Sequence, residues 1–146
     1  MRAWTHLLRV HAATVRLLSA SLQAEHGLSI NGYEALALLA QAPDRRLKRV
    51  ELARGLVLTP SGVTRLLEGL EEAGLVARAG CPGDLRVSYA QLTDAGAERL
   101  ESASCGHVGS IRALLEEHLS ATELDELVEL LGKLPGAYDS APEEFG

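Results

Sequence analysis

Aromatic residues are scarce in this chain of 146 residues, which contains one Trp, three Tyr, one Phe and a single Met. Nevertheless, 47% of the residues are hydrophobic. The core must therefore be built from Leu, Val and Ala, which is typical of helical proteins. A chain of this length can bury a core of its own, so we expect one domain over residues 1–146.

Further absences exclude several classes of protein. No apolar run approaches the length that crosses a membrane, and no basic segment with a cleavage site opens the chain, so we expect a soluble cytoplasmic protein. The two cysteines, Cys81 and Cys105, form no CxxC pair, and the five histidines lack the short spacings of metal ligands. We therefore expect free thiols, no metal and no cofactor.

The sequence also offers no catalytic constellation. It has no Gly-rich phosphate loop, no carboxylates at metal-binding spacing, and no nucleophile with a matching base. We expect that the protein is not an enzyme.

Charge is distributed unevenly along the chain. The formal net charge is −6, yet residues 1–43 and residues 44–94 each carry +1, and residues 95–146 carry −8. The acidity thus lies in the C-terminal third. The central segment is weakly positive, which permits a nucleic-acid interface there with modest, salt-sensitive affinity.

Hydrophobic residues recur at three- and four-residue steps, which predicts amphipathic helices. We expect helices over about residues 3–25, 31–41 (with Ser29 as candidate cap), 50–55, and from Thr59-Pro60 to Gly74. Strands over 75–79 and 86–92 flank a turn over 80–85, Thr93 caps a fifth helix, and Ser120 and Glu123 form the capping box of a sixth. Buried positions are expected at Val50, Leu52, Ala53 and Leu56 in the third helix and at Val63, Leu66, Leu67 and Leu70 in the fourth.

The segment from Leu47 to Thr93 predicts a helix-turn-helix followed by a β-hairpin, which is a device for binding duplex DNA in the major groove. The fourth helix offers short hydrogen-bonding groups, a close backbone approach and a guanidinium that can pair with guanine. We expect DNA contacts from its residues Thr59, Ser61, Gly62, Thr64 and Arg65, and phosphate contacts from Lys48 and Arg49. An amphipathic helix whose polar face is merely solvated is the alternative.

At this point the sequence resembles the MarR family of bacterial transcription regulators. The resemblance rests on the run Leu58-Thr59-Pro60-Ser61-Gly62-Val63-Thr64-Arg65-Leu66, on Leu70-Glu71 and Gly74-Leu75-Val76, and on Asp84-Leu85-Arg86 followed by Leu92-Thr93. It implies a mainly α (α+β) fold with a winged helix-turn-helix core at about 30–93. It further implies dimerisation helices at about 3–26 and 94–135, a tail at 136–146, and a homodimer on a pseudo-palindromic operator of double-stranded DNA.

The resemblance assigns roles to two residues of the hairpin, or wing. Arg86 would enter the minor groove and Asp84 would orient it. The narrow minor groove concentrates negative potential that attracts Arg, and a carboxylate can hold a guanidinium through paired hydrogen bonds. The alternative is a surface salt bridge of little energetic consequence. The neutral tip Gly80-Cys81-Pro82-Gly83 departs from the more basic wings of the family.

Dimerisation has support beyond the resemblance, because the apolar stripes of the terminal helices are too extensive for one small monomer. An intramolecular helical bundle is the alternative, and periodicity does not exclude it.

The resemblance also implies release from DNA when a small aromatic acid or phenol enters a crevice beside the dimerisation helices. Candidate lining residues are Trp4, His11, Tyr33, His107 and Arg78. For Trp4 and His11, which lie on an apolar stripe, packing at a dimer interface is the favoured alternative.

The sequence thus predicts a DNA-binding transcriptional regulator, specifically a repressor released by such a ligand. Two alternatives remain open. Oxidation of Cys81 at the wing would place bulk or charge beside DNA, and the acidic net charge would suit a winged-helix module that binds protein.

Overall fold

A computed structural model describes residues 1–56, 58–81 and 84–135, with the side chains of 81 and 84–87 outside the description. The helices are α1 (Arg2–His26), α2 (Ile30–Gln41), α3 (Arg49–Gly55), α4 (Pro60–Glu72), α5 (Asp94–Glu116) and α6 (Ala121–Gly132). The strands are β1 (Arg46–Lys48), β2 (Val76–Cys81) and β3 (Asp84–Leu92), and a short 3-10 turn η1 (Pro43–Arg45) precedes β1. The mainly helical fold class with a small sheet is confirmed.

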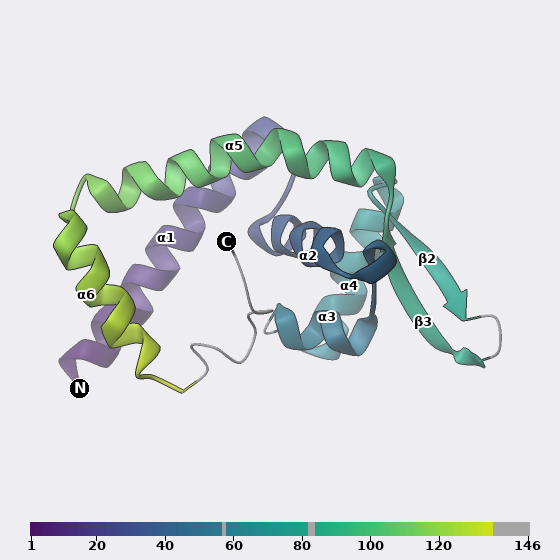
Figure 1. Ribbon diagram of the computed structural model, residues 1–146, viewed down its shortest axis with the longest axis horizontal. Coiled ribbons are helices and arrows are strands. Elements are labelled where there is room, and N and C mark those ends of the chain that lie inside the picture. The colour runs from purple at the N-terminus through teal and green to yellow at the C-terminus, as the bar shows by residue number, and fades with distance from the viewer. Residues whose placement is uncertain (57, 82–83, 136–146) are drawn as a thin grey trace.

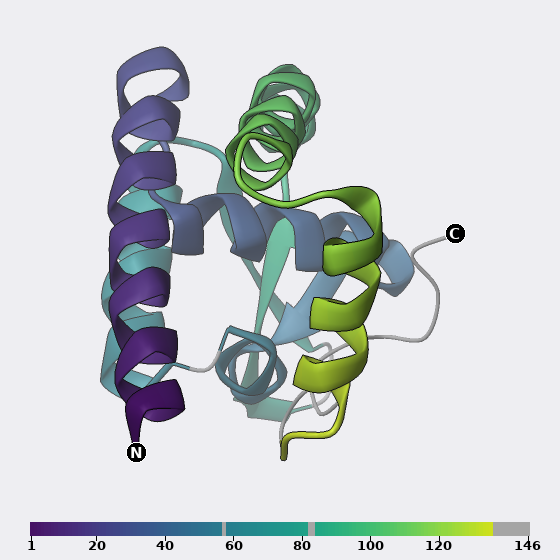
Figure 2. The same cartoon turned by 90° about the vertical axis from the view of Figure 1, so that its left-hand side faces the viewer.

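Helix α5 runs along one side of the molecule, from α6 to the base of the β2–β3 hairpin (Figure 1). Helices α2, α3 and α4 and the sheet lie below one end of α5, and the β2–β3 hairpin projects beyond them. Helix α6 follows the other end of α5 and turns back below it, and α1 crosses α5. Figure 2 separates α1 from α6, although the two overlap in Figure 1. Helices α1 and α6 therefore do not lie side by side.

The helix ends follow the predicted caps. The backbone N–H groups of Gly32, Gly62 and Gly96 donate to the side-chain oxygens of Ser29, Thr59 and Thr93 at 3.0, 3.2 and 3.0 Å. The capping box is present as well, because the Ser120 N–H donates to the Glu123 carboxylate at 2.9 Å and the Glu123 N–H to Ser120 Oγ at 3.4 Å. The Ser120 hydroxyl also donates to the Glu123 carboxylate, at 2.7 Å, and the two bonds that the carboxylate accepts from the Ser120 N–H and hydroxyl lower its pKa. Each cap satisfies an N–H that the helix itself cannot pair.

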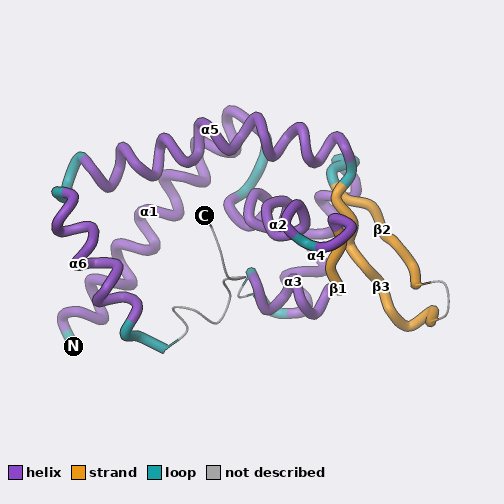
Figure 3. The backbone as a smooth tube through the Cα atoms, viewed as in Figure 1, coloured by secondary structure: helices purple, strands orange, loops and turns teal. Residues whose placement is uncertain are grey.

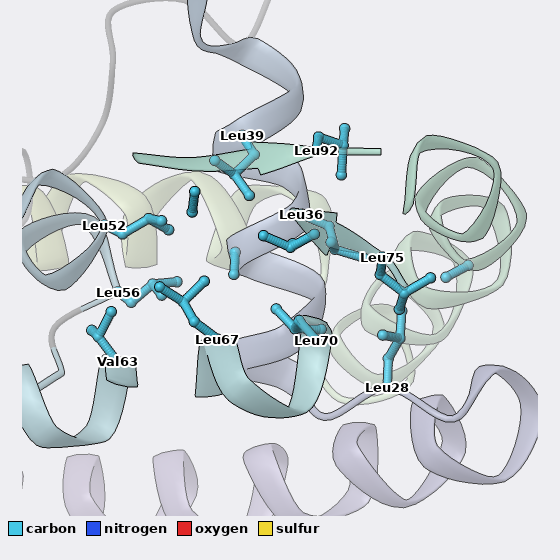
Figure 4. Packing of buried hydrophobic residues seen from close by; sticks show 14 of the residues in the cluster. Leu28, Leu36, Leu39, Leu52, Leu56, Val63, Leu67, Leu70, Leu75 and Leu92 are labelled. Carbon is cyan, nitrogen blue, oxygen red and sulfur yellow. The ribbon is translucent and has the colours of Figure 1, made fainter. Parts of the chain in front are cut away.

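One hydrophobic core lies between α2, α3, α4 and the base of the sheet (Figure 4). Its fully buried side chains include Leu36, Leu39, Leu52 and Leu67. In α4 the stripe of Val63, Leu67 and Leu70 is buried as predicted, and Leu66 is only half-buried. Val50 was predicted to be buried but is 56% exposed. Val50 precedes Leu52 by two positions, which on a helix places its side chain on nearly the opposite face. The core packs against the face that carries Leu52 and Leu56.

The sheet has the order β1-β3-β2, with antiparallel pairs throughout (Figure 3). The hairpin strands are longer than predicted and pair up to Cys81 and Asp84, with a register shift between Gly80 and Cys81. Strand β1 was not predicted. Its three residues are Leu47 and a basic residue on either side, which is too short a run to show the alternation of a strand. They form a strand because they pair with Tyr89–Gln91 of β3.

Candidate nucleic-acid interface

The N-terminus of α4 is held by its own cap. Thr59 Oγ1 accepts from the Gly62 N–H and lies 3.2 Å from Ser61 Oγ, and the Thr59 carbonyl accepts from the Val63 N–H. Pro60 has no N–H. Within the first turn this leaves the N–H of Ser61 to meet a phosphate. For binding an anion, this helix start therefore offers a single backbone donor in its first turn.

The side chains that face away from the core on α4 remain accessible. Ser61 and Arg65 are exposed, and Gly62 and Thr64 are partly exposed. Thr64 donates its hydroxyl proton to the Pro60 carbonyl at 3.0 Å, so its lone pairs are left to accept from a base or a water. A Cβ at Gly62 would lie 3.3 Å from Thr59 Oγ1, so the glycine also leaves room for the cap. The structure thus places these four predicted residues on one accessible surface.

Glu71, in the last turn of α4, joins three elements that sequence reasoning did not connect. Its Oε2 accepts from Arg78 Nε of β2 at 2.8 Å, and its Oε1 lies 3.7 Å from a guanidinium nitrogen of Arg49, the first residue of α3. The Arg49 and Glu71 atoms of the second pair are buried and have no hydrogen-bond partner. Glu71 thereby fixes α3 and the wing strand relative to α4. A phosphate contact by Arg49 would have to share its guanidinium with Glu71.

Periodicity marks Glu71 only as another polar position on α4. The one feature of the sequence that indicated a role for Glu71 was its place in the Leu70-Glu71 motif. The same pairing accounts for Arg78. Its guanidinium turns toward α4, which separates Arg78 from the other candidate ligand-binding residues.

Basic side chains also line the edge strand β1. Arg46 stacks over the ring of Tyr89 at 5.3 Å, and Lys48 is exposed beside it. Arg45 and Arg46 lie 3.6 and 3.4 Å from the carboxylates of Asp94 and Asp44. These exposed pairs are weak and leave the guanidinium groups accessible to an anion. Lys48 thus lies at a sheet edge next to α3, as a flanking phosphate contact requires.

The wing residues can be placed only by their backbone. Asp84 and Arg86 lie on β3 near the hairpin tip, and their side chains, like that of Cys81, lie outside the described residues. Their predicted roles remain predictions. Cys105 is a free, exposed cysteine on α5.

The four candidate ligand-binding residues other than Arg78 lie in three different parts of the structure. Trp4, at the start of α1, is 58% exposed. His11 lines a cavity beside α2. Tyr33 and His107 instead pack edge to face with ring centroids 4.6 Å apart, and the Tyr33 hydroxyl donates to Ser104 Oγ. Burial lowers the pKa of His107. Tyr33 and His107 therefore join α2 to α5, whereas His11 lines a cavity that could hold a ligand.

The described residues show neither a candidate metal site nor a helix suited to crossing a membrane. They contain no cluster of three or more His, Cys, Asp or Glu side chains placed to hold a metal. Among these residues, no helix combines the length and hydropathy that crossing a membrane requires.

A helix-turn-helix whose second helix is accessible, backed by a projecting hairpin, defines a winged-helix DNA-binding protein. The sequence pattern of the MarR family matches residues 28–88. The HTH-type transcriptional repressor YetL of Bacillus subtilis strain 168 is 39% identical to this chain over 111 residues. The match covers 76% of this chain and 66% of YetL, which is slightly under two thirds of the length of YetL.

Solved structures agree with the family pattern. Sco3205 of Streptomyces coelicolor, a MarR family transcriptional regulator in complex with DNA, is 32% identical with a TM-score of 0.82, over 89% of this chain and 81% of that one. AbsC of the same organism, also a MarR family transcriptional regulator, is 31% identical with a TM-score of 0.79, over 88% and 86%. The chain belongs to the MarR family of transcriptional regulators. These relatives are regulators, in agreement with the expectation that the chain is not an enzyme.

Proposed function

We propose that this protein is a cytoplasmic repressor that binds a pseudo-palindromic operator as a homodimer. The observation that carries the proposal is the exposed surface of Ser61, Gly62, Thr64 and Arg65 on α4, next to a projecting hairpin. YetL is a transcriptional repressor by name, and Sco3205 was solved with DNA. A gel shift with the intergenic DNA upstream of the gene tests it. No shift at low salt without effector would favour the protein-binding module instead.

Exposed apolar surface on α1 and α6 supports the homodimer. Large apolar side chains on α1 and α6 are exposed, with Trp4 at 58%, Leu8 at 49%, Val128 at 67% and Leu131 at 40%. No side chain of α6 is buried. Apolar surface on this scale is typical of an interface. A second copy, packed through α1, α5 and α6, would cover it and would place two α4 helices for the two halves of an operator.

Arg65→Ala is expected to relax the base preference of DNA binding as well as its affinity. A guanidinium that pairs with a guanine discriminates against other bases by about 1–3 kcal/mol. Binding to operators substituted one base pair at a time, measured by fluorescence anisotropy, checks this. Equal weakening on every sequence would make Arg65 a phosphate contact.

Arg86→Ala is expected to weaken operator binding and to leave the homodimer intact, because its charge is proposed to act in the minor groove. Anisotropy gives the affinity, and light scattering coupled to size-exclusion chromatography gives the oligomeric state. Unchanged operator affinity would remove the wing arginine from the mechanism.

Release of the operator by a small aromatic ligand is the second half of the proposal. Its support is the cavity beside His11, which lies where α1 meets the turn between α3 and α4. A ligand there would act at the junction of the dimerisation helices and the DNA-binding unit.

A further inference from the structure

The cavity beside His11 has a volume of about 530 Å³ and lies between α1, the start of α2 and the turn that leads from α3 to α4. This volume is within the range of small-molecule sites. Most of its wall is apolar, and a few polar groups converge on it. The residues that matter here are Val15, Leu56 and Leu58 on the apolar side, and His11, Asn31 and Glu34 on the polar side.

The wall of this cavity is acidic, which is not expected of a site for an aromatic acid. Glu34 is the one carboxylate among the described lining residues, and neither Lys nor Arg lines the cavity. Burial raises the pKa of Glu34, and the nearby His11 on α1 partly offsets this. The turn between α3 and α4 contributes only Leu56 and Leu58 to the described wall. A desolvated carboxylate of this kind gains most from a cationic hydrogen-bond donor.

We propose that this cavity binds a small, largely apolar ligand with a protonated amine or amidine that pairs with Glu34. The inference rests on the proposed ligand-controlled release and names the chemical class of the ligand. An aromatic acid, which the family resemblance suggested, would bring a second carboxylate against Glu34. Like charges at short range disfavour that arrangement.

The position of the cavity explains how such a ligand would control DNA binding. Leu56 and Leu58 line it, and Thr59, the cap of α4, follows directly. A ligand seated between α1 and this turn changes the position of the start of α4 relative to α1. Since α1 belongs to the proposed dimer interface, that change alters the spacing of the two α4 helices on an operator.

Benzamidine and benzoate test the charge preference, because they share a ring and differ in the sign of the charged group. We expect benzamidine, and not benzoate, to bind the full-length protein in titration calorimetry at pH about 8, which is well above the ordinary pKa of a Glu carboxyl. Glu34→Gln should weaken benzamidine binding about ten-fold or more. Glu98→Gln, which removes the same charge from an exposed site on α5, should leave binding unchanged.

Two further readouts place the ligand in this cavity. Val15→Phe, which fills the cavity without changing its charge, should also abolish benzamidine binding. Wild-type affinity should fall as pH is lowered through the raised pKa of Glu34, because the carboxyl loses its charge.

Absence of benzamidine binding, equal or tighter binding of benzoate, or unchanged benzamidine affinity in Glu34→Gln would each overturn the inference. Benzoate binding that Arg65→Ala abolishes would place an anion in the smaller cavity, of about 270 Å³, that Arg65 lines beside α4, and would overturn it as well. Operator binding is measured separately, by gel shift without ligand. Failure of the gel shift alone therefore rejects the proposed function, and failure of the calorimetry alone rejects the ligand class.

Discussion

Gly96→Ala is expected to lower the free energy of unfolding by about 3 kcal/mol, at the upper end of what overpacking costs. A Cβ at Gly96, in the first turn of α5, would collide with the carbonyl oxygen of Leu75 and would lie 2.7 Å from Leu92 Cδ1. The Leu75 carbonyl cannot easily retreat, because it accepts the Thr93 N–H at 3.2 Å. Urea unfolding followed by circular dichroism, at fixed protein concentration, measures the loss.

Gly109→Ala is the matched control on the same helix. A Cβ built there would meet no atom within 4 Å apart from its chain neighbours and the backbone of its own helix. The same substitution should therefore stabilise the protein by about 0.5–1 kcal/mol through helix propensity alone. Equal effects at the two glycines would show that the close packing of α5 on Leu75 does not contribute to stability.

Val128→Glu is expected to convert the proposed homodimer into a folded monomer and to reduce operator affinity about 100-fold or more, because the two DNA-binding units then bind independently. Val128 is 67% exposed on α6, so a charge there costs nothing in the isolated chain and becomes buried only in a dimer. Light scattering gives the mass in solution, and anisotropy gives the affinity for the full operator.

Thr122→Glu serves as the control, because it adds the same charge to an exposed position on the polar side of α6, near Glu126 and Glu129. It should change neither mass nor affinity. A Val128→Glu protein that remained dimeric would exclude α6 from the interface.

The local structure of this protein was largely predictable from its sequence. Ser29, Thr59, Thr93 and Ser120 all cap the helices that they were expected to cap. Gly27 and Gly74 adopt positive φ angles of 66° and 72° just beyond the ends of α1 and α4. These features depend on a few neighbouring residues, so the sequence states them directly.

Features that depend on distant residues were missed. Strand β1 exists because β3 pairs with it, and Glu71 acquires its role because Arg49 and Arg78 reach it from either side. The sequence likewise did not show that Tyr33 and His107 pack against each other across α2 and α5, or that Glu34 lines a cavity; a ligand-binding role for Tyr33 and His107 stays a prediction. Periodicity identifies the face that a residue occupies and not the partner that it meets there.

The sequence by itself therefore determined the helices, the wing and the family, because caps, turns and motif spacings are local chemistry. It also placed Ser61, Gly62, Thr64 and Arg65 on the accessible side of α4. Only the tertiary structure decided which charges are paired, which apolar stripes are left uncovered on α1 and α6, and which carboxylate lines the cavity. Those properties arise where separate elements meet, and burial there changes the energy of a charge or an apolar surface in ways that no single segment encodes.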